Sequence, residues 1–474
     1  MDDLKGPHDM RFRTALERLD AAGRLTKVRV ELDPHLEVSG CMKRLDGDRA
    51  LLFEAVRGAR MPVLGNFLAS PANVEAALGT DLAGVRGLML RALTDDPLPP
   101  VSVADGPVHE VVHTTGIDLA QLLPVLRHAP GDGGAFITAG VVLVRDPETG
   151  VSNASYHRLQ LVGLSQTAIK LDYGRHLRAA FEAACRAGEP LPIAVCIGTD
   201  LALMYAAAFM GSQMPASADE LAAAGALRGG PLELVPCVSQ PLAVPAETEI
   251  VIEGTVLPSQ TVHEGPFGEF VGYLSDEGPA PVFEVSAVTT RRSPVYHAIN
   301  GAGRETIMLR KHVLEACALQ AVGASVPIVS DAELTVGVLH RFHLVLQVRK
   351  TLPQHEGMQR NAMLAAFAAL KDLDLVVVVD DDIDVHDAVD VEYAVATRME
   401  ASRDLVVVPG ARGHEYVRVS DHGIRAKLGV DATVPLAERA RFSRVEFIEP
   451  TIDPAACTFA PGASSLDWLA DGHA

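Results

Sequence analysis

Apolar positions in the first hundred residues change between helical and strand-like spacing. The segment "MRFRTALERLDAA" repeats apolar residues every three or four positions and is followed by Gly23, which predicts an amphipathic helix ending near that glycine. "LTKVRVEL" alternates apolar and polar residues and predicts a strand, whereas "SPANVEAALG" is typical of a capped helix. The proline-rich "DDPLPPVSV" ends this mixed region. We therefore predict an N-terminal α/β domain over residues 1–110.

The region that follows is dominated by strand patterns. Two helical stretches, "HLRAAFEAACRAG" and "ADELAAAGAL", interrupt it. The predicted strands are "AFITAGVVLVRD", "SYHRLQLVG", "LPIAVCIG", "PCVSQPLAVP", "TEIVIEGTVL" and "PVFEVSAVTT". Many strands with few helices favour a barrel-like sheet, which we place at residues 111–304.

A long helical pattern and an alternating α/β pattern complete the chain. "RETIMLRKHVLEACALQAV" predicts a connecting helix over residues 305–323. Beyond it, the strands "FHLVLQVRK", "LDLVVVVDDDID" and "DLVVVPG" are separated by the helical patterns "GMQRNAMLAAFAALKD" and "DVEYAVATRM". The unbroken apolar run "LVVVV" indicates a strand buried on both faces, and hence α/β layering. The expected fold class of the whole chain is thus mixed α/β, with a C-terminal α/β domain over 324–474.

Composition narrows the class of protein without identifying it. With 48% hydrophobic and 22% charged residues, the 474-residue chain is expected to bury a sizeable core. No apolar run reaches the ~20 residues of a membrane span, and the N-terminus carries no apolar signal region. A net charge of −20 argues against nucleic acid or an anionic membrane as partner. Six cysteines without a CxxC pair favour reduced thiols, so a cytoplasmic location is expected.

The stretch "EGPFGEFVGY" places two glutamates five residues apart. Neither regular element would bring Glu264 and Glu269 together, because helical neighbours are three or four residues apart and an odd spacing on a strand sends side chains to opposite faces. Gly265, Pro266 and Gly268 would allow the backbone to bend between them. We expect a bent loop that turns both carboxylates into one pocket; an ordinary glycine-rich turn is the alternative.

Other polar positions gain meaning only in combination. Taken singly, Arg158 in "VSNASYHRLQLVG" fits a solvent-facing strand residue and Asn153 a turn residue. His176 opens a predicted helix, and Glu220 lies in the first turn of another, where a carboxylate suits the helix dipole. The acidic run at 380–384, "DDDID", fits either a metal cluster or a solvated turn after a strand.

Read in order, the segments "N-x4-R", "RH", "E-x3-AGALRG", "EGPFGE", "DDDID" and "KLGVDAT" form one pattern. This pattern resembles the UbiD family of decarboxylases, and the resemblance runs from about Leu16 to Thr433. It implies reversible, non-oxidative removal of CO2 from an aromatic, heteroaromatic or α,β-unsaturated carboxylic acid, with prenylated flavin mononucleotide (FMN) as cofactor. It also implies a split β-barrel that holds the flavin, a C-terminal oligomerisation domain, a homodimer or larger homo-oligomer, and a flavin prenyltransferase that supplies the cofactor.

The resemblance also implies metal ligands. Asn153, His176 and Glu220 match the positions that bind a divalent metal, Mn²⁺ or Mg²⁺, which holds the cofactor phosphate. An amide oxygen, an imidazole and a carboxylate suit a fairly hard cation of this kind. Ser212 and Met214 match a potassium (K⁺) site.

Other assignments at the cofactor site follow from the resemblance less directly. Arg175 precedes His176 and is expected to contact the cofactor or its phosphate. Lys371 and Lys427 are both candidates for a lysine that helps to bind that phosphate. Glu233 competes with Glu220 for the acidic metal ligand, and the "E-x3-AG" pattern favours Glu220.

The catalytic group that the resemblance implies is Arg158, Glu264 and Glu269. Glu264 would hold Arg158, which in turn would orient the substrate carboxylate through its planar fork. Glu269, with a raised pKa, would deliver the proton that replaces CO2. The cofactor is required because no ordinary side chain accepts the electrons left behind when CO2 departs.

Two other functions compete with this reading. A metal-dependent hydrolase would use Asn153, His176, Glu220 and the aspartates at 380–384, with Glu264 as base and no flavin. A non-catalytic accessory subunit would keep the fold alone, but it would have no reason to retain charged residues buried together.

Overall fold

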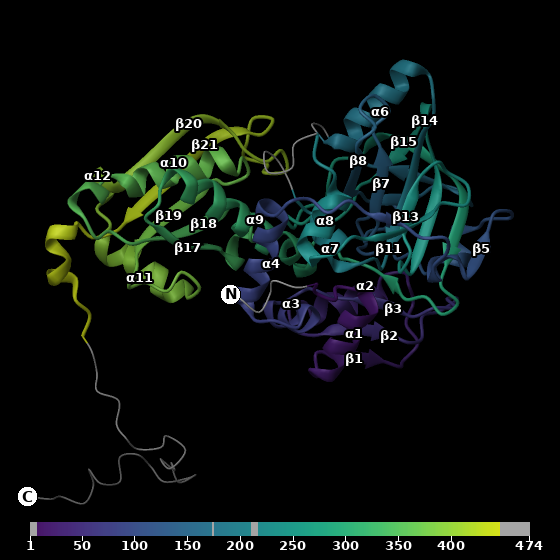
Figure 1. Ribbon diagram of the computed structural model, residues 1–474, viewed down its shortest axis with the longest axis horizontal. Helices are drawn as coiled ribbons and strands as arrows, with labels where there is room; N and C mark the ends of the chain where they lie inside the picture. Colours follow the sequence, from purple (N-terminus) through teal and green to yellow (C-terminus); the bar gives the residue numbers. More distant parts are fainter. Residues whose placement is uncertain (1–6, 173–174, 210–216, 446–474) are drawn as a thin grey trace, which may run out of the picture. The chain divides into compact units, whose positions relative to one another are not determined.

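The computed structural model of the chain describes residues 7–172, 175–209 and 217–445 (Figure 1). Residues Met1–Thr433 form one compact unit and Val434–Ala474 form a second. The described part of the second unit carries the short 3-10 helix η5 (Leu436–Phe442). All sheets described below belong to the first unit. The division of the chain at residues 110, 304 and 323 stays a prediction.

The N-terminal part combines helices with a small sheet in the order β1-β2-β3-β16. Both helices predicted here are present; Ser70 caps α3 by accepting from Asn73 N, and Gly79 ends it in a left-handed conformation. Helix α4 had no predicted counterpart. The elements are α1 (Phe12–Ala21), β1 (Leu25–Val28), α2 (Glu37–Arg44), β2 (Ala50–Phe53), β3 (Val63–Gly65), α3 (Pro71–Leu78), α4 (Leu82–Thr94) and, from later in the chain, β16 (Tyr296–His297).

The central part is built on the largest sheet of the described residues, a nine-stranded sheet that curls into a half-barrel. Its strands follow the order β6-β9-β10-β15-β14-β11-β7-β8, and β5 pairs with β15. Register shifts in the long pair β14–β15 bend these two strands. The strands are β5 (Val111–His113), β6 (Phe136–Ile137), β7 (Val141–Arg145), β8 (Ser152–Tyr156), β9 (Leu159–Leu161), β10 (Gln166–Ile169), β11 (Leu191–Ile197), β14 (Ile250–Glu264) and β15 (Gly278–Thr290).

Helices and a small three-stranded sheet accompany the half-barrel. The order of the small sheet is β13-β12-β4. These elements are β4 (Val101–Ser102), η1 (Pro107–His109), α5 (Leu119–Leu122), α6 (His176–Ala187), α7 (Leu201–Ala206), α8 (Glu220–Arg228), β12 (Glu233–Pro236) and β13 (Ala243–Pro245). The single strand predicted from "PCVSQPLAVP" is wrong, because the chain turns back within it: Glu253 accepts hydrogen bonds from Val238 N and Ser239 N and so stabilises a reversal between β12 and β13.

The third part follows the long helix α9 (Arg304–Ser325) and has the predicted α/β layering. Its sheet runs β17-β18-β19-β21-β20, with β18, β19 and β21 parallel. Val376 and Val378 of β19 belong to the core cluster that includes residues of α10, whereas Val377 and Val379 belong to the cluster that includes residues of α11, so the strand is buried on both faces. Figure 1 shows α10 and α11 on opposite sides of the sheet. The elements are β17 (Val329–Leu334), η3 (Val336–Val338), β18 (His343–Val348), η4 (Pro353–His355), α10 (Met358–Ala369), β19 (Leu375–Asp380), α11 (Ala388–Arg398), α12 (Ala401–Asp404), β20 (Leu405–Arg412) and β21 (Ile424–Ala432).

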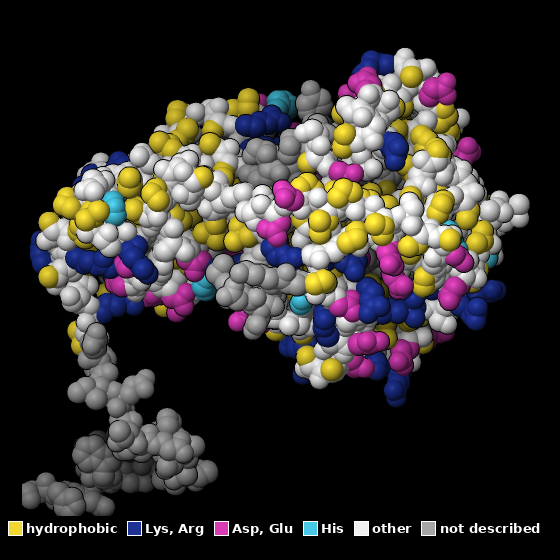
Figure 2. All heavy atoms as spheres, viewed as in Figure 1, with side chains coloured by type: hydrophobic (Ala, Val, Ile, Leu, Met, Phe, Trp, Pro, Cys, Tyr) yellow, Lys and Arg dark blue, Asp and Glu magenta, His cyan; other side chains and the backbone are white. Residues whose placement is uncertain are grey.

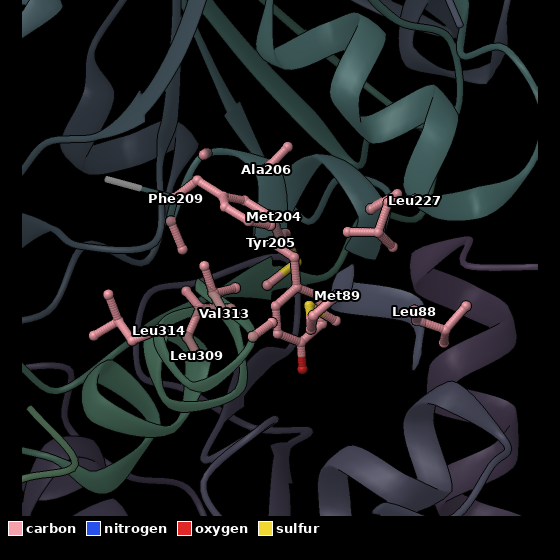
Figure 3. Packing of buried hydrophobic residues seen from close by; sticks show 14 of the residues in the cluster. Leu88, Met89, Met204, Tyr205, Ala206, Phe209, Leu227, Leu309, Val313 and Leu314 are labelled. Atoms are coloured by element: carbon pink, nitrogen blue, oxygen red, sulfur yellow. The ribbon is translucent and has the colours of Figure 1, made fainter. Parts of the chain in front are cut away.

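Apolar packing joins these parts within the first unit. Helices α4, α7, α8 and α9 meet in one buried cluster, which includes Met89, Tyr205, Leu227 and Val313 (Figure 3). Acidic and basic side chains are interspersed over the face drawn in Figure 2, so the net charge of −20 is not gathered in one patch there. Within the described ranges, no helix has the length and apolar character needed to cross a bilayer.

Candidate active site

Arg158 lies at a break between two strands. Strand β8 ends at Tyr156 and β9 begins at Leu159, so the continuous strand predicted over this segment is interrupted. His157 stabilises the break because its Nδ1 donates to the Lys170 carbonyl at 2.8 Å. The side chain of Arg158 therefore leaves the strand alternation and is 8% exposed.

Both glutamates of the "EGPFGE" loop contact this arginine. Arg158 Nε and Nη2 donate to the two oxygens of Glu264 at 2.7 and 3.0 Å, and Nη1 donates to Glu269. Nη2 also donates to Ser275 Oγ at 3.0 Å, and the guanidinium lies 5.2 Å from the centre of the Phe267 ring. Both carboxylates thus meet at one arginine, as the bent loop predicted, and of the two only Glu269 lines the cavity described below.

The bend between the glutamates is held by backbone hydrogen bonds. Gly265 has a φ of 89°, and its N–H donates to Gln160 Oε1 at 2.8 Å. The N–H of Gly268 donates to Asp132 Oδ1 at 2.9 Å. A Cβ atom on Gly133 would lie 2.0 Å from the Gly265 carbonyl oxygen, so only glycine fits there. Glu264 and Glu269 thus sit on a fixed loop.

The two glutamates differ in their surroundings. Glu264 is 1% exposed and paired twice with Arg158, whereas Glu269 is 16% exposed and paired once. Burial raises the pKa of Glu269, and Arg158 only partly offsets this effect. Burial alone would lower the pKa of Arg158, but the two carboxylates outweigh it and hold that pKa above its ordinary value. The direction of this shift is the one expected of a proton donor, and the role of Glu269 as that donor stays a prediction.

Asn153, His176 and Glu220 come together from three separate elements. Asn153 Nδ2 lies 2.8 Å from Glu220 Oε1 and 3.3 Å from His176 Nδ1, and the last two atoms are 3.8 Å apart. His176 and Glu220 are the first residues of α6 and α8, so two helix N-termini meet here. The nearby carboxylate of Glu220 raises the pKa of His176.

These three side chains fit a divalent cation. Glu220 is buried and receives hydrogen bonds only from Asn153 Nδ2 and Ala154 N among the described residues, and a half-turn of the Asn153 amide would present its oxygen instead. Carboxylate, imidazole and amide oxygen suit Mn²⁺ or Mg²⁺. The helix N-termini would also favour a phosphate nearby. Within the described ranges, no three His, Cys, Asp or Glu side chains form another metal-binding group.

The remaining predicted cofactor contacts divide into three cases. Ser212 and Met214, the predicted K⁺ site, lie outside the described residues. Arg175 lines the cavity described below, and Lys371 lines a smaller adjoining hollow with it. Lys427 instead donates to the backbone carbonyls of Lys371 and Leu373, which favours Lys371 as the cofactor lysine.

A cavity connects the Arg158 cluster to the third part of the chain. Its walls include Arg158 and Glu269 at the "EGPFGE" loop, the face of α9 that carries Leu309 and Arg310, and Tyr416. Phe267, Ile299 and Leu309 supply apolar wall, which suits a flat unsaturated ligand. Tyr416 OH donates to Asp172 Oδ1 at 3.0 Å across the cavity wall.

The aspartates at 380–384 do not join this site. Asp382 pairs with Arg398 through both oxygens, at 2.8 and 2.6 Å, and Asp380 contacts the same arginine at 3.2 Å. The run follows β19, and its charges are used within the C-terminal sheet and α11. The metal-cluster alternative for this run is therefore wrong.

Sequence reasoning missed several residues of the site. Ser275, Asp132 and Gln160 hold Arg158 and the loop, but nothing in their local sequence marks them. Tyr416 reaches the cavity from a distant hairpin. Arg310 had no distinct signal either, because Lys311 and His312 follow it directly in "TIMLRKH".

Comparison with known families agrees with this site. The model for the Rift-related domain of 3-octaprenyl-4-hydroxybenzoate carboxy-lyase (UbiD) matches residues 100–304. The models for the N-terminal and C-terminal domains of the same family match residues 16–89 and 308–432. The chain belongs to the UbiD family and is a carboxy-lyase. The hydrolase alternative is thereby set aside.

Individual relatives cover nearly the whole chain. Anhydromevalonate phosphate decarboxylase of Methanothermobacter thermautotrophicus is 35% identical over 88% of this chain and 95% of its own length. Gallate decarboxylase of Lactiplantibacillus plantarum is 30% identical over 89% of this chain and 93% of its own length. The solved structure of the UbiD-class enzyme HmfF from Pelotomaculum thermopropionicum in complex with FMN has a TM-score of 0.89 and 40% identity, covering 94% of this chain and 100% of HmfF.

An evolved dimeric form of HmfF has also been solved in complex with prenylated FMN. It matches with a TM-score of 0.85 and 38% identity, over 94% of this chain and 99% of its own length. The similarity therefore extends across all three parts of the first unit.

Proposed function

We propose that this protein uses prenylated FMN to remove CO2, reversibly and without net oxidation, from a planar aromatic, heteroaromatic or α,β-unsaturated acid. The observation that carries the proposal is the Arg158 cation held between Glu264 and Glu269 beside an apolar cavity wall. The complexes of HmfF with FMN and prenylated FMN support the choice of cofactor. The gallate decarboxylase relative supports an aromatic substrate class.

The cofactor would be held mainly through its phosphate. Asn153, His176 and Glu220 would bind Mn²⁺ or Mg²⁺, whose charge anchors the phosphate. Arg175 and Lys371 would add direct contacts from the cavity side. When bound, prenylated FMN supplies the electron sink that no side chain of the chain offers. A K⁺ ion at Ser212 and Met214 remains part of the prediction.

The residues of the chain would orient the acid and supply a proton. Glu264 holds the guanidinium of Arg158 through Nε and Nη2, and Arg158 would present its remaining N–H groups to the substrate carboxylate. After the bond to CO2 breaks, the carboxyl of Glu269 would donate its proton to the same carbon. The raised pKa of Glu269 supports this role, because a buried acid retains its proton at higher pH. Phe267, Ile299 and Leu309 would exclude water.

Two partners complete the proposal. A flavin prenyltransferase would supply the modified cofactor, since the chain itself is expected only to bind it. The protein would act as a homodimer or larger homo-oligomer joined through its C-terminal part; a dimeric form of HmfF is one of the similar structures.

The test compares two preparations of the protein. One is produced together with a flavin prenyltransferase and exposed to oxygen, and the other is produced without that partner. We expect only the first to release CO2 from members of a panel of aromatic and α,β-unsaturated acids, and to exchange solvent deuterium into the product carbon. Equal activity in both preparations would refute the requirement for prenylated FMN.

A further inference from the structure

The cavity that contains Arg158 also carries a second group of cations. Arg175, Arg310 and Arg341 line it from three separate segments: the residue before α6, the N-terminal third of α9 and the stretch before β18. Burial lowers the pKa of Arg310 to about 9, and the charges of Arg341 and Arg175 add to this effect. Such mutual repulsion indicates that the group is arranged around an anion.

The three arginines differ in how their charges are compensated. Arg341 donates twice to Asp372, at 2.9 and 2.6 Å, and its guanidinium lies 4.7 Å from the centre of the Phe270 ring. Arg310 makes no hydrogen bond or ion pair within the ranges that the structure describes. The two carboxylates whose charges act on it, Asp172 and Asp372, each have a closer partner, Tyr416 OH and Arg341. Arg310 is thus the cation of the group that lacks an anion.

The position of Arg310 in the cavity wall indicates that a bound ligand supplies the anion that compensates its charge. Leu309 and Arg310 follow Thr306 by three and four residues on α9, so the three side chains share one face of the helix, and all of them line the cavity. A guanidinium withdrawn from water is unfavourable unless an anion and hydrogen bonds replace the water. The cavity is where that anion could enter, and its apolar lining includes Leu309 and Ile299. A planar fork of donors favours a carboxylate or another planar anion.

The cofactor phosphate has a separate set of candidate anchors. Asn153, His176 and Glu220 meet at the N-termini of α6 and α8 and are not among the residues that line this cavity. Arg175 directly precedes His176, so we group it with the candidate anchors of the phosphate. Arg310 comes from a different helix and shares its wall with Leu309 and Thr306.

We propose that the substrate carries a second anionic group, which Arg310 binds while Arg158 holds the carboxylate that is lost. The substrate class is then a planar, unsaturated dicarboxylic acid rather than a monocarboxylic one. This inference rests on the proposed decarboxylase function and narrows its substrate. Arg310 acts as a specificity-determining residue, because a monoacid would leave its charge uncompensated inside the cavity.

The test uses matched pairs of acids that differ only in a second carboxylate, such as benzoate with benzene-1,4-dicarboxylate, cinnamate with 4-carboxycinnamate, and five-ring heteroaromatic monoacids with their diacids. With cofactor-loaded protein, we expect kcat/KM for the best diacid to exceed that for its monoacid. Arg310→Gln should lower this ratio by about 10- to 100-fold, the effect of one charge-assisted hydrogen bond. Arg310→Lys should lower it less. Arg178→Gln, which removes an arginine paired with Glu182 on α6, is the matched control and should leave the ratio unchanged.

Two further measurements separate the possible failures. Flavin content of Arg310→Gln, measured by absorbance, should equal that of the unaltered protein; loss of flavin would assign Arg310 to the cofactor phosphate and overturn the proposal. Calorimetric titration of diacid and monoacid into loaded protein gives the binding preference without turnover. If no acid is decarboxylated but the diacid binds more tightly in an Arg310-dependent way, the proposed function fails and the anion site stands. A monoacid preference, or a ratio unaffected by Arg310→Gln, would overturn the site alone.

Discussion

Replacing Glu269 with glutamine tests the proposed chemistry most directly. The substitution keeps the size and shape of the side chain and removes only its ability to donate a carboxyl proton. Arg158 would keep both hydrogen bonds to Glu264, at 2.7 and 3.0 Å, and its bond to Ser275. The amide oxygen of the new side chain could still accept from Arg158 Nη1. The guanidinium should therefore stay in place.

The size of the effect follows from this geometry. Since the group that would hold the substrate carboxylate is retained, KM should change only a few-fold. The loss should fall on kcat, by about 10²- to 10⁴-fold, as is typical when a general acid is removed. This corresponds to about 3 to 5 kcal/mol in the activation free energy.

The assay measures kcat and KM for CO2 release and, separately, the exchange of solvent deuterium into the decarboxylated product. Glu269→Gln should lose both activities while keeping its full content of cofactor. The matched control is Glu277→Gln, the same chemical change at an exposed glutamate that pairs with His263, and it should behave like the unaltered protein. Turnover by Glu269→Gln within about tenfold of the unaltered protein would refute its role as proton donor, because the effect expected of a general acid is larger.

Three further expectations concern the metal, the loop and the pH dependence of stability. His176→Ala, or removal of divalent ions by a chelator, should release the flavin on gel filtration because its phosphate loses an anchor; full retention would contradict the metal assignment. Ser275→Ala removes the acceptor of both Arg158 Nη2 and Phe267 N, so kcat/KM should fall by about 10- to 100-fold at unchanged cofactor content. In the folded protein, the hydrogen bonds that His386 makes to Asp331 and Glu333 raise the pKa of His386 to about 9. The protonated imidazole therefore stabilises the fold fully below the unfolded pKa of 6.5, and this stabilisation is lost as pH rises through about 9. The thermal unfolding temperature should thus fall more steeply between pH 6.5 and 9 in the unaltered protein than in His386→Asn, and parallel curves would disprove the linkage.

The sequence by itself determined several of the elements and the need for a bend in the "EGPFGE" loop. Period-two and period-3.6 patterns predicted α1, α3, α9 and the doubly buried strand β19, since these features depend on which faces of a local element are apolar. The spacing of Glu264 and Glu269 around two glycines required a bend, which the structure contains. The ordered motifs also indicated the family, because a family is characterised by the residue types in its motifs and their order, which can be read without knowing where the side chains lie in space.

Tertiary structure decided what these side chains face. Arg158 leaves its strand because His157 bonds to Lys170 across the break, a contact that no periodicity reports. The strand predicted at 236–245 reverses because Glu253, from another strand, accepts its backbone N–H groups.

The cation group of the cavity shows the same limit. Arg175 and Arg341 are 166 residues apart in the chain yet line the same cavity as Arg310. The sequence fixes each charge, but only the folded chain decides which of those charges is left without a partner, because compensation depends on distances between segments that the sequence keeps apart.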